Sequence, residues 1–409
     1  MMERSKCMNI PKVRFHGFKE KWREESLSKL FVERHEISTI TESLPQLSFT
    51  ISEGVIYPDD RKSNKRDFLI KDILSKKYLV TCVGDILYNP ANVIYGAIHR
   101  NSLCDGVVSP IYKIFKTEQD SNFMECVVRN PSFISQLSMK TEGTVTKLKT
   151  LKPESFLEMI VKIAPSIYEQ RKIASYFQTL DSLIQTTSKK LASLKQIKAA
   201  SLQSMFPQEG ETVPKVRFKG FEGEWNLKYV FELLCERNEL SPQSSEFPLM
   251  AFIANNGIAE KGERYDRSAL VNDVINKQYK RTYYGDFIYS SNNLGTGSIG
   301  LNTYGKATIS PVYSIFYCTL NSDSNFVGYC MTRKSFIKEM IKWRQGVMYG
   351  QWRIHENDFL RIKVLVPSLP EQQQIGTYFR NLDQQISLQT QRLEKLKQIK
   401  SACLDKMFV

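Results

Sequence analysis

The chain has 409 residues, more than one hydrophobic core of ordinary size usually serves, so we expect two or more domains. Its 42% hydrophobic and 11% aromatic content excludes a largely disordered chain, and no apolar run approaches the ~18 residues of a membrane span. Lys and Arg number 57 against 43 Asp and Glu, and the resulting net charge of +14 indicates an anionic partner, nucleic acid before a membrane surface.

The chemistry of the rarer residues points away from a metal centre. The four histidines are dispersed, and the eight cysteines form no C-x-x-C pair, which disfavours a zinc site. Scattered thiols are typical of a reducing compartment, and the first ten residues lack the apolar segment of a secretion signal. We therefore expect a soluble, cytoplasmic protein with no metal and no cofactor.

A segment near the start of the chain is the first half of a repeat. Residues 10–18, Ile-Pro-Lys-Val-Arg-Phe-His-Gly-Phe, are followed by Trp22. The pattern returns at residues 213–221 as Val-Pro-Lys-Val-Arg-Phe-Lys-Gly-Phe, followed by Trp225. Residues 84–88 likewise match 285–289, and residues 165–206 match 367–408 without a gap. An offset near 202 throughout indicates a duplicated chain of two long copies.

The interior of each copy carries strand-like runs followed by polar loops. Asn89 and Asn92 follow the run at 85–88, while Asn292 and Asn293 follow the run at 286–289. Asparagine can bind adenine in a bidentate manner, so these four residues are candidate base readers. The other interpretation is a turn, because Asn and Gly readily adopt left-handed conformations.

Other segments with basic, amide and aromatic side chains could contact DNA phosphates and bases together. They supply the remaining candidates: Lys147, Lys149, Arg344, Tyr349, Gln351 and Arg353. The basic run at residues 61–66 could bind phosphates or be merely exposed charge, and its candidates are Arg61, Lys62, Lys65 and Arg66.

After Pro165 and again after Pro367 the apolar residues recur at alternating steps of three and four, the spacing of a coiled-coil seam. The seam residues are Ile173, Phe177, Leu180, Ile184, Leu191 and Leu194, and Ile375, Phe379, Leu382, Ile386, Leu393 and Leu396. One seam position in each copy is polar, Thr187 and Gln389, which can set the register. Each pattern predicts a helix of about 37 residues, or ~55 Å.

A long helix with one apolar stripe needs a partner, and its own duplicate is the leading candidate. The fold class we expect is α+β, with two recognition domains and two long helices that form an antiparallel intramolecular coiled coil. The boundaries are residues 1–164 and 208–366 for the domains, and 165–207 and 367–409 for the helices. Two alternatives stay open: each helix could pack on its own domain, or the coiled coil could form between molecules.

At this point the residues resemble a known family, the specificity (S) subunits of type I restriction–modification enzymes. The carriers of the resemblance are the Pro-Ser-Leu-Pro-Glu-Gln-Gln-Gln-Ile stretch at 367–375, its counterpart at 165–170, the Leu-Lys-Gln-Ile-Lys stretch at 396–400 and the two Pro-Lys-Val-Arg-Phe openings. Each motif is weak alone, but their matching order in both copies is specific. The resemblance covers essentially the whole chain.

The resemblance implies a non-catalytic subunit that binds double-stranded DNA. Each recognition domain would read one half of a bipartite, asymmetric site, and the helices would fix the spacing between the halves. The helices would also bind methyltransferase subunits, two per chain, which in turn recruit motor–nuclease subunits. The alternative is a free-standing tandem DNA-binding regulator, although regulators usually meet a palindrome as dimers with identical readers.

Two segments could be mistaken for reaction chemistry. Residues 295–300 match G-x-G-x-x-G, yet the residues that follow are turn-rich, whereas a dinucleotide site needs a helix there. Residues 88–91, Tyr-Asn-Pro-Ala, only partly match the N-P-P-aromatic motif of adenine methyltransferases. We therefore expect no catalytic residues in this chain.

Overall fold

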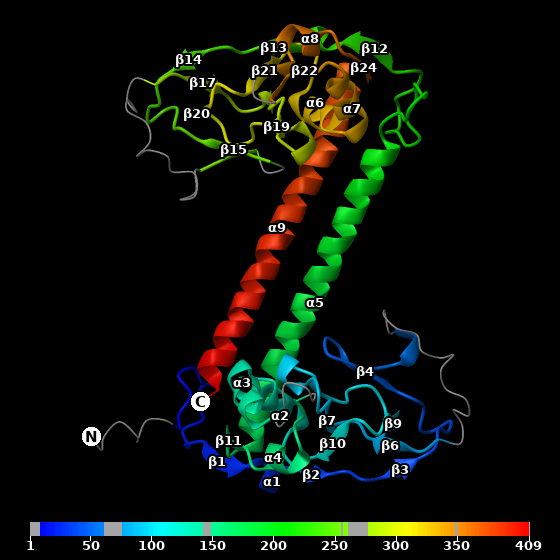
Figure 1. The fold of residues 1–409 in the computed structure, drawn as a ribbon, viewed down its shortest axis with the longest axis vertical. Coiled ribbons are helices and arrows are strands. Elements are labelled where there is room, and N and C mark those ends of the chain that lie inside the picture. The colour runs from blue at the N-terminus through cyan, green and yellow to red at the C-terminus, as the bar shows by residue number, and fades with distance from the viewer. Residues whose placement is uncertain are drawn as a thin grey trace. The chain divides into compact units, whose positions relative to one another are not determined.

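The computed structural model describes residues 9–60, 76–141, 149–254, 257–260, 277–347 and 351–408 (Figure 1). The chain divides into two compact units. Unit 1 comprises residues 1–187 together with 392–409, and unit 2 comprises residues 188–391. Each unit is therefore built from one interior of the repeat and from parts of both long helices.

Unit 1 combines small antiparallel sheets with short helices. Its sheets have the orders β1-β11, β2-β10-β7-β8, β3-β6-β9 and β4-β5. The strands are β1 (Arg23–Ser26), β2 (Val32–Glu33), β3 (Ile37–Ser38), β4 (Ser48–Thr50), β5 (Gly54–Ile56), β6 (Tyr78–Thr81), β7 (Ile86–Tyr88), β8 (Ile98–Arg100), β9 (Gly106–Val108), β10 (Lys113–Lys116) and β11 (Ile160–Ile163). The short helices are α1 (Leu27–Leu30), α2 (Ser121–Val128), α3 (Pro131–Lys140) and α4 (Pro153–Leu157).

Unit 2 repeats this plan, and its described residues also form the β22–β23 hairpin. Its sheets have the orders β12-β24, β13-β21-β18-β19, β14-β17-β20, β15-β16 and β22-β23. The strands are β12 (Asn226–Tyr229), β13 (Leu234–Glu236), β14 (Leu240–Ser241), β15 (Ala251–Ile253), β16 (Gly257–Ala259), β17 (Tyr279–Thr282), β18 (Phe287–Tyr289), β19 (Ile299–Leu301), β20 (Ala307–Ile309), β21 (Ser314–Cys318), β22 (Gln345–Val347), β23 (Gln351–Arg353) and β24 (Lys363–Val366). The helices are α6 (Ser324–Met331), α7 (Lys334–Lys342) and α8 (Glu356–Leu360).

Equivalent polar contacts hold the sheets and caps in both units. Asp120 Oδ1 caps α2 by accepting from Phe123 N at 2.9 Å, and Asp323 Oδ1 caps α6 by accepting from Phe326 N at 2.8 Å. Arg34 binds Asp85 in unit 1, and Arg237 binds Asp286 in unit 2, each with Nε–Oδ2 at 2.8 Å. A common scaffold therefore supports two interiors that differ in sequence.

The two long helices are α5 (Ile167–Ser204) and α9 (Leu369–Met407), with 38 and 39 residues (Figure 1). The α+β fold class and the two long helices predicted from the sequence are confirmed. At 1.5 Å per residue each helix is roughly 57 Å long. Residues 167–187 of α5 belong to unit 1 and the rest to unit 2, whereas the last part of α9, from Arg392, belongs to unit 1.

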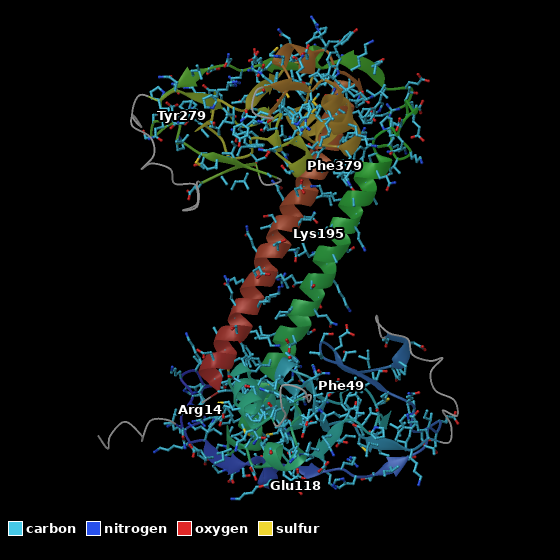
Figure 2. The ribbon with its side chains drawn as sticks, in the orientation of Figure 1. Arg14, Phe49, Glu118, Lys195, Tyr279 and Phe379 are labelled. Carbon is cyan, nitrogen blue, oxygen red and sulfur yellow. The ribbon has the colours of Figure 1, made fainter. Side chains whose placement is uncertain are left out.

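Most seam residues are removed from solvent. Those in the unit 1 core are Ile173, Phe177 and Leu180, with Leu396 packed against it, and those in the unit 2 core are Leu194, Ile375, Phe379 and Leu382, with Ile386 packed against it. Leu191 and Leu393 are also buried, and Ile184 is half-buried. Phe379 is labelled in Figure 2. The seam residues therefore pack in the domain cores as well as against the partner helix.

Within unit 1, α5 and α9 run antiparallel. Tyr176 Oη lies 3.3 Å from Cys403 Sγ, and Lys400 Nζ lies 2.5 Å from Asp181 Oδ1. The residue numbers rise along α5 while they fall along α9, which is the signature of an antiparallel pair.

Unit 2 contains the equivalent contacts with the roles of the two helices exchanged. Ser201 Oγ lies 3.0 Å from Tyr378 Oη, and Lys198 Nζ lies 2.5 Å from Asp383 Oδ1. Each of these residues is the repeat counterpart, at an offset of 202, of one in the unit 1 pairs. The helices pack on the domains and also on each other, so the two intramolecular interpretations of the seam are compatible.

A buried ion pair joins the opening segment of each copy to the start of its long helix. In unit 1, Arg14 donates to Glu169 through Nε at 2.6 Å and Nη2 at 2.8 Å, and the Glu169 side chain is 1% exposed (Arg14 is labelled in Figure 2). In unit 2, Arg217 donates to Glu371 in the same way, at 2.6 and 2.7 Å. The hydrogen bonds to Glu169 raise the pKa of Arg14 above its ordinary value. We call these two bidentate pairs the Arg–Glu clasps.

The glutamine that follows each clasp glutamate holds the same joint. Gln170 Nε2 donates to Ala164 O at 2.8 Å, and its Oε1 accepts from the backbone N–H of Asp120 at 3.1 Å. In unit 2, Gln372 Nε2 donates to Pro367 O at 3.0 Å, and Gln372 Oε1 accepts from Asp323 N at 3.2 Å. Both glutamines are buried, so the Glu-Gln dipeptide of the repeated motif is a structural joint.

The end of the other long helix reaches the same joint. In unit 1, Val13 N donates to Lys406 O of α9 at 3.0 Å, and Phe408 packs on Trp22, Phe123 and Phe177. In unit 2, Val216 N donates to Ser204 O of α5 at 2.9 Å, and Phe206 occupies the equivalent aromatic cluster. Each opening segment therefore contacts the start of one long helix and the end of the other.

Glycine is required where α9 passes the first turn of α6. A Cβ on Gly376 would lie 2.3 Å from Asp323 Oδ1 and 2.9 Å from Phe326 N. This close approach explains why a residue with low helix propensity stands inside a long helix.

Removal of a clasp glutamate should destabilise its unit. The change Glu371→Ala leaves the Arg217 guanidinium without its buried partner, and we expect it to lower the free energy of unfolding by about 3 kcal/mol. Urea unfolding followed by tryptophan fluorescence measures the change. The control Glu339→Ala removes an exposed ion pair with Lys342 and should cost less than about 1 kcal/mol. Equal effects of the two changes would contradict the role of the clasp.

Candidate nucleic-acid interface

Two segments predicted separately to contact DNA lie together in unit 2. The loop after β18 and the β22–β23 hairpin are joined by two hydrogen bonds. Asn292 Oδ1 accepts from Trp352 N at 2.5 Å, and Ser291 Oγ accepts from Ile354 N at 3.0 Å. Asn292 thus uses its side-chain acceptor to hold the hairpin, which gives it a positioning role.

The hairpin presents large exposed side chains beside this anchor. Gln351, Trp352 and Arg353 are all exposed, with Trp352 49% exposed. The Arg353 guanidinium lies 3.5 Å from Glu356 and remains half-exposed. An amide, an aromatic ring and a guanidinium on one strand can together bind phosphate, stack on a base and donate to base edges.

Arg344, at the start of the hairpin, is unusual. Its Nε and Nη2 atoms are buried and have no hydrogen-bond partner among the described residues. Burial lowers the pKa of the Arg344 guanidinium, yet an arginine stays protonated in proteins. A charged donor without an acceptor favours an anionic ligand at this position.

Unit 1 has the corresponding loop against the corresponding segment. Leu151 N donates to Pro90 O at 3.0 Å, and Tyr88 Oη donates to Leu151 O at 3.3 Å, as Tyr289 Oη donates to Ile354 O at 3.4 Å. Asn89 Oδ1 accepts from Ala91 N at 3.0 Å, so this asparagine builds the turn. Asn92 is half-buried, and Lys149 is exposed next to Leu151.

Several predicted candidates lie outside the described residues. These are Arg61, Lys62, Lys65, Arg66, Lys147 and Tyr349. Asn293 is exposed and precedes a short 3-10 turn, where its side chain makes no capping hydrogen bond.

Apart from Asn292, the residues that position this interface were not predicted individually. Ser291 and Trp352 were within the segments considered, but a side chain that anchors a distant backbone amide leaves no pattern in one sequence. Trp352 could have been predicted from its position between Gln351 and Arg353, which are both candidate DNA-contacting residues. The clasp residues Arg14 and Glu169 were visible only as parts of repeated motifs.

The glycine-rich segment is not a dinucleotide site. Residues 294–296 form a 3-10 turn, Gly297 follows with φ 90°, and strand β19 begins at Ile299. A pyrophosphate would need the N-terminus of a helix at this place, and a strand cannot supply it.

The described residues also contain little that resembles a reaction centre. Among them, no group of three or more His, Cys, Asp or Glu side chains is placed to bind a metal ion. Burial raises the pKa of Cys126 to about 12 and that of Cys330 to about 11, so both thiols stay protonated at neutral pH. Within the same ranges, no helix has the length and apolar character needed to cross a bilayer.

Comparison with known proteins agrees with this picture. Residues 227–398 match the family described as type I restriction modification DNA specificity domain. The resemblance to specificity subunits found in the sequence is therefore confirmed.

Comparisons of sequence and of structure each match most of the chain. The type I restriction enzyme MjaIX specificity subunit of Methanocaldococcus jannaschii is 22% identical over 357 residues, 79% of this chain and 76% of that protein. The type I S subunit from M. genitalium has a TM-score of 0.60 at 14% identity and covers 98% of this chain and 99% of its own, which shows a common fold. The HsdS subunit from Thermoanaerobacter tengcongensis has a TM-score of 0.41 at 16% identity, over 95% of this chain and 96% of its own.

Loss of the Asn292 side chain should loosen the β22–β23 hairpin. In Asn292→Ala we expect the amides of Trp352 and Ile354 to exchange hydrogen roughly five- to tenfold faster, because one hydrogen bond of about 1 kcal/mol is removed. Hydrogen–deuterium exchange with mass spectrometry measures the rates. Asn293→Ala is the matched control and should leave both amides unchanged; identical rates in the two variants would refute the anchor.

Proposed function

We propose that the chain is the sequence-reading subunit of a type I restriction–modification complex. Residues 1–164 and 208–366 are the target-recognition domains, and residues 165–207 and 367–409 are helical spacers. Each recognition domain reads one half of a bipartite, asymmetric site in double-stranded DNA. The chain supplies recognition, and methyl transfer and DNA cleavage belong to its partners.

The observation that carries this proposal is the contrast between a repeated scaffold and loops that differ between the two units. The Arg–Glu clasps and the Arg34–Asp85 and Arg237–Asp286 pairs recur with nearly the same distances in both units. The loops after β7 and β18 differ in sequence, and exposed Trp352 stands near the second. A duplicated frame with different readers favours a site whose two halves differ.

Electrostatics support a nucleic-acid ligand. The net charge of +14 would attract the phosphate backbone, and release of counterions would make binding weaker as salt rises. Arg344 and Arg353 are the described guanidinium groups at the unit 2 interface, and Lys149 is the exposed cation at its unit 1 counterpart.

The helices supply the second part of the proposal. The two helices, each ~57 Å long, would fix the spacing between the two half-sites, which lie about one DNA turn, ~34–36 Å, apart when they are read on the same face. Exposed residues along them, such as Lys195 in Figure 2, leave a surface for methyltransferase subunits, two per chain. Motor–nuclease subunits would join through the assembled complex.

Domain exchange tests the proposal directly. We expect replacement of residues 213–366 by those of a relative to change only one half of the methylated DNA motif. The measurement is sequencing of methylated adenines in cells that express the chain with its methyltransferase subunit. A change in both halves, or in neither, would contradict the domain assignment. A free-standing regulator would bind DNA but support no methylation at all.

A further inference from the structure

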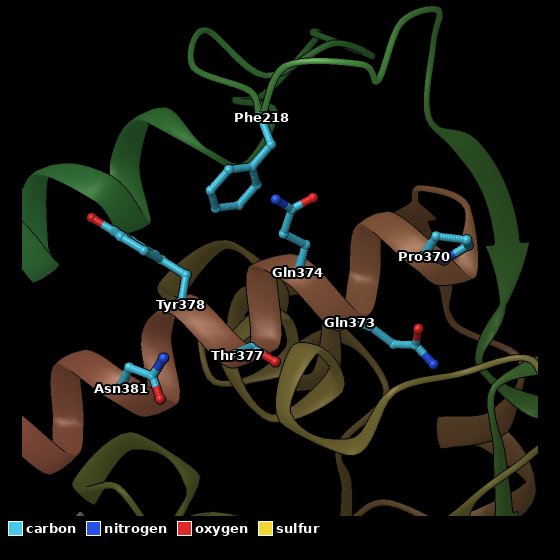
Figure 3. A pocket seen from close by; sticks show the side chains of 7 residues that line it. All are labelled: Phe218, Pro370, Gln373, Gln374, Thr377, Tyr378 and Asn381. Carbon is cyan, nitrogen blue, oxygen red and sulfur yellow. The ribbon is translucent and has the colours of Figure 1, made fainter.

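A groove of about 490 Å³ lies on the surface of unit 2 where α9 begins (Figure 3). Phe218 and Tyr378 form its aromatic wall, with their rings edge to face at 5.9 Å. Gln373, Gln374 and Asn381 line it with exposed amides. All of these residues belong to unit 2. The groove is thus neutral, rich in hydrogen-bonding groups and open to solvent.

In unit 1, a cation of the chain itself lies over the equivalent aromatic pair. Phe15 and Tyr176 form the equivalent aromatic pair, also at 5.9 Å. Lys172 Nζ lies 5.6 Å from the centre of the Phe15 ring, a cation–π contact. The counterpart of Lys172, at the offset of 202, is Gln374. In the part of unit 2 that the structure describes, no cationic group lies over the Phe218 ring.

The charges next to the two aromatic pairs differ as well. Arg171 stands beside Lys172 in unit 1; its Nε lies 4.0 Å from Asp120 Oδ2, and its side chain is 67% exposed. Its counterpart in unit 2 is Gln373. Unit 1 therefore presents two cationic side chains beside its aromatic pair, whereas unit 2 presents two neutral amides. The same partner would meet different surfaces at the two units, although the backbone and the aromatic pair are alike.

We propose that the unit 2 groove accepts a lysine or arginine side chain of a methyltransferase subunit, whereas unit 1 fills the equivalent place with its own Lys172. This inference rests on the proposed function, because it concerns the helix faces assigned to methyltransferase docking. Unit 1 shows which chemistry such an aromatic pair takes, namely an ammonium group over the phenylalanine. In unit 2, the amide oxygen of Gln374, which lies beside the Phe218 ring in Figure 3, can also accept a hydrogen bond from a cation.

Two identical methyltransferase subunits should therefore bind the two units with unequal affinity. A cationic side chain gains a cation–π contact at unit 2, but at unit 1 it meets the charges of Arg171 and Lys172. We expect the first methyltransferase subunit to bind at unit 2 and the second to bind at unit 1 roughly five- to tenfold more weakly. Added salt should narrow the difference, because it screens the repulsion at unit 1.

Native mass spectrometry of the full chain, titrated with its purified methyltransferase subunit, tests this assignment. In the unchanged protein the 1:1 complex should accumulate before the 2:1 complex. Gln374→Lys should weaken the first step roughly fivefold or more, because the new ammonium covers Phe218. Gln374→Glu should strengthen the first step, because it offers a carboxylate to the cation.

Lys172→Gln is the matched control in unit 1. It opens the equivalent groove and should strengthen the second step while the first stays unchanged. The melting temperature of each variant, measured without partner, should stay within a degree or two, since both positions are exposed.

Four outcomes would count against the inference. Two equal steps in the unchanged protein, or no response to either change at Gln374, would exclude a cation in this groove while two bound subunits still supported the proposed function. Loss of a dimer of this chain in Gln374→Lys would identify a second copy as the occupant. Failure of the methyltransferase to bind at all would count against the proposed function itself.

Discussion

The fold depends on the two Arg–Glu clasps. Each clasp buries a glutamate at the first turn of a long helix and satisfies both of its oxygens with one guanidinium. Because a buried carboxylate is stable only when it is paired, the first turns of α5 and α9, which carry Glu169 and Glu371, are stable only when the opening segment of the same copy is in place. The opening segment in turn donates a backbone hydrogen bond to the end of the other long helix. In each unit, the clasp and this backbone hydrogen bond together join three distant parts of the sequence.

This arrangement gives each helix two tasks. The first part of α5 belongs to the core of unit 1 and its last part to unit 2, whereas α9 is used in the opposite order. The residues that bind domain and helix together must then be retained in both copies, while the loops after β7 and β18 are free to differ. Retained joints and divergent loops are what a reader of two different half-sites requires.

The repeat made most of the fold predictable. Period and motif spacing gave the two helices, their antiparallel pairing and the α+β class, since a seam of twelve matched residues is a long-range signal within one sequence. The candidate site was harder to predict from the sequence. That Asn292 reads bases stays a prediction. The sequence did not indicate that its side chain anchors Trp352 N, because this contact across 60 residues depends on tertiary packing. The sequence also did not predict small differences between the two units. Tyr329 Oη donates to Asp383 Oδ2 at 2.6 Å, whereas the counterpart of Tyr329 in unit 1, Cys126, borders a cavity of about 140 Å³.

The central claim is that α5 and α9 pair within one molecule, and zero-length cross-linking tests it most directly. A carbodiimide should join Lys400 to Asp181 and Lys198 to Asp383, because both pairs are in contact and partly exposed. An equimolar mixture of light and isotope-labelled chains would be cross-linked and analysed by mass spectrometry. We predict both cross-links as light–light and heavy–heavy peptides only. Light–heavy peptides, or the absence of both cross-links, would contradict the account.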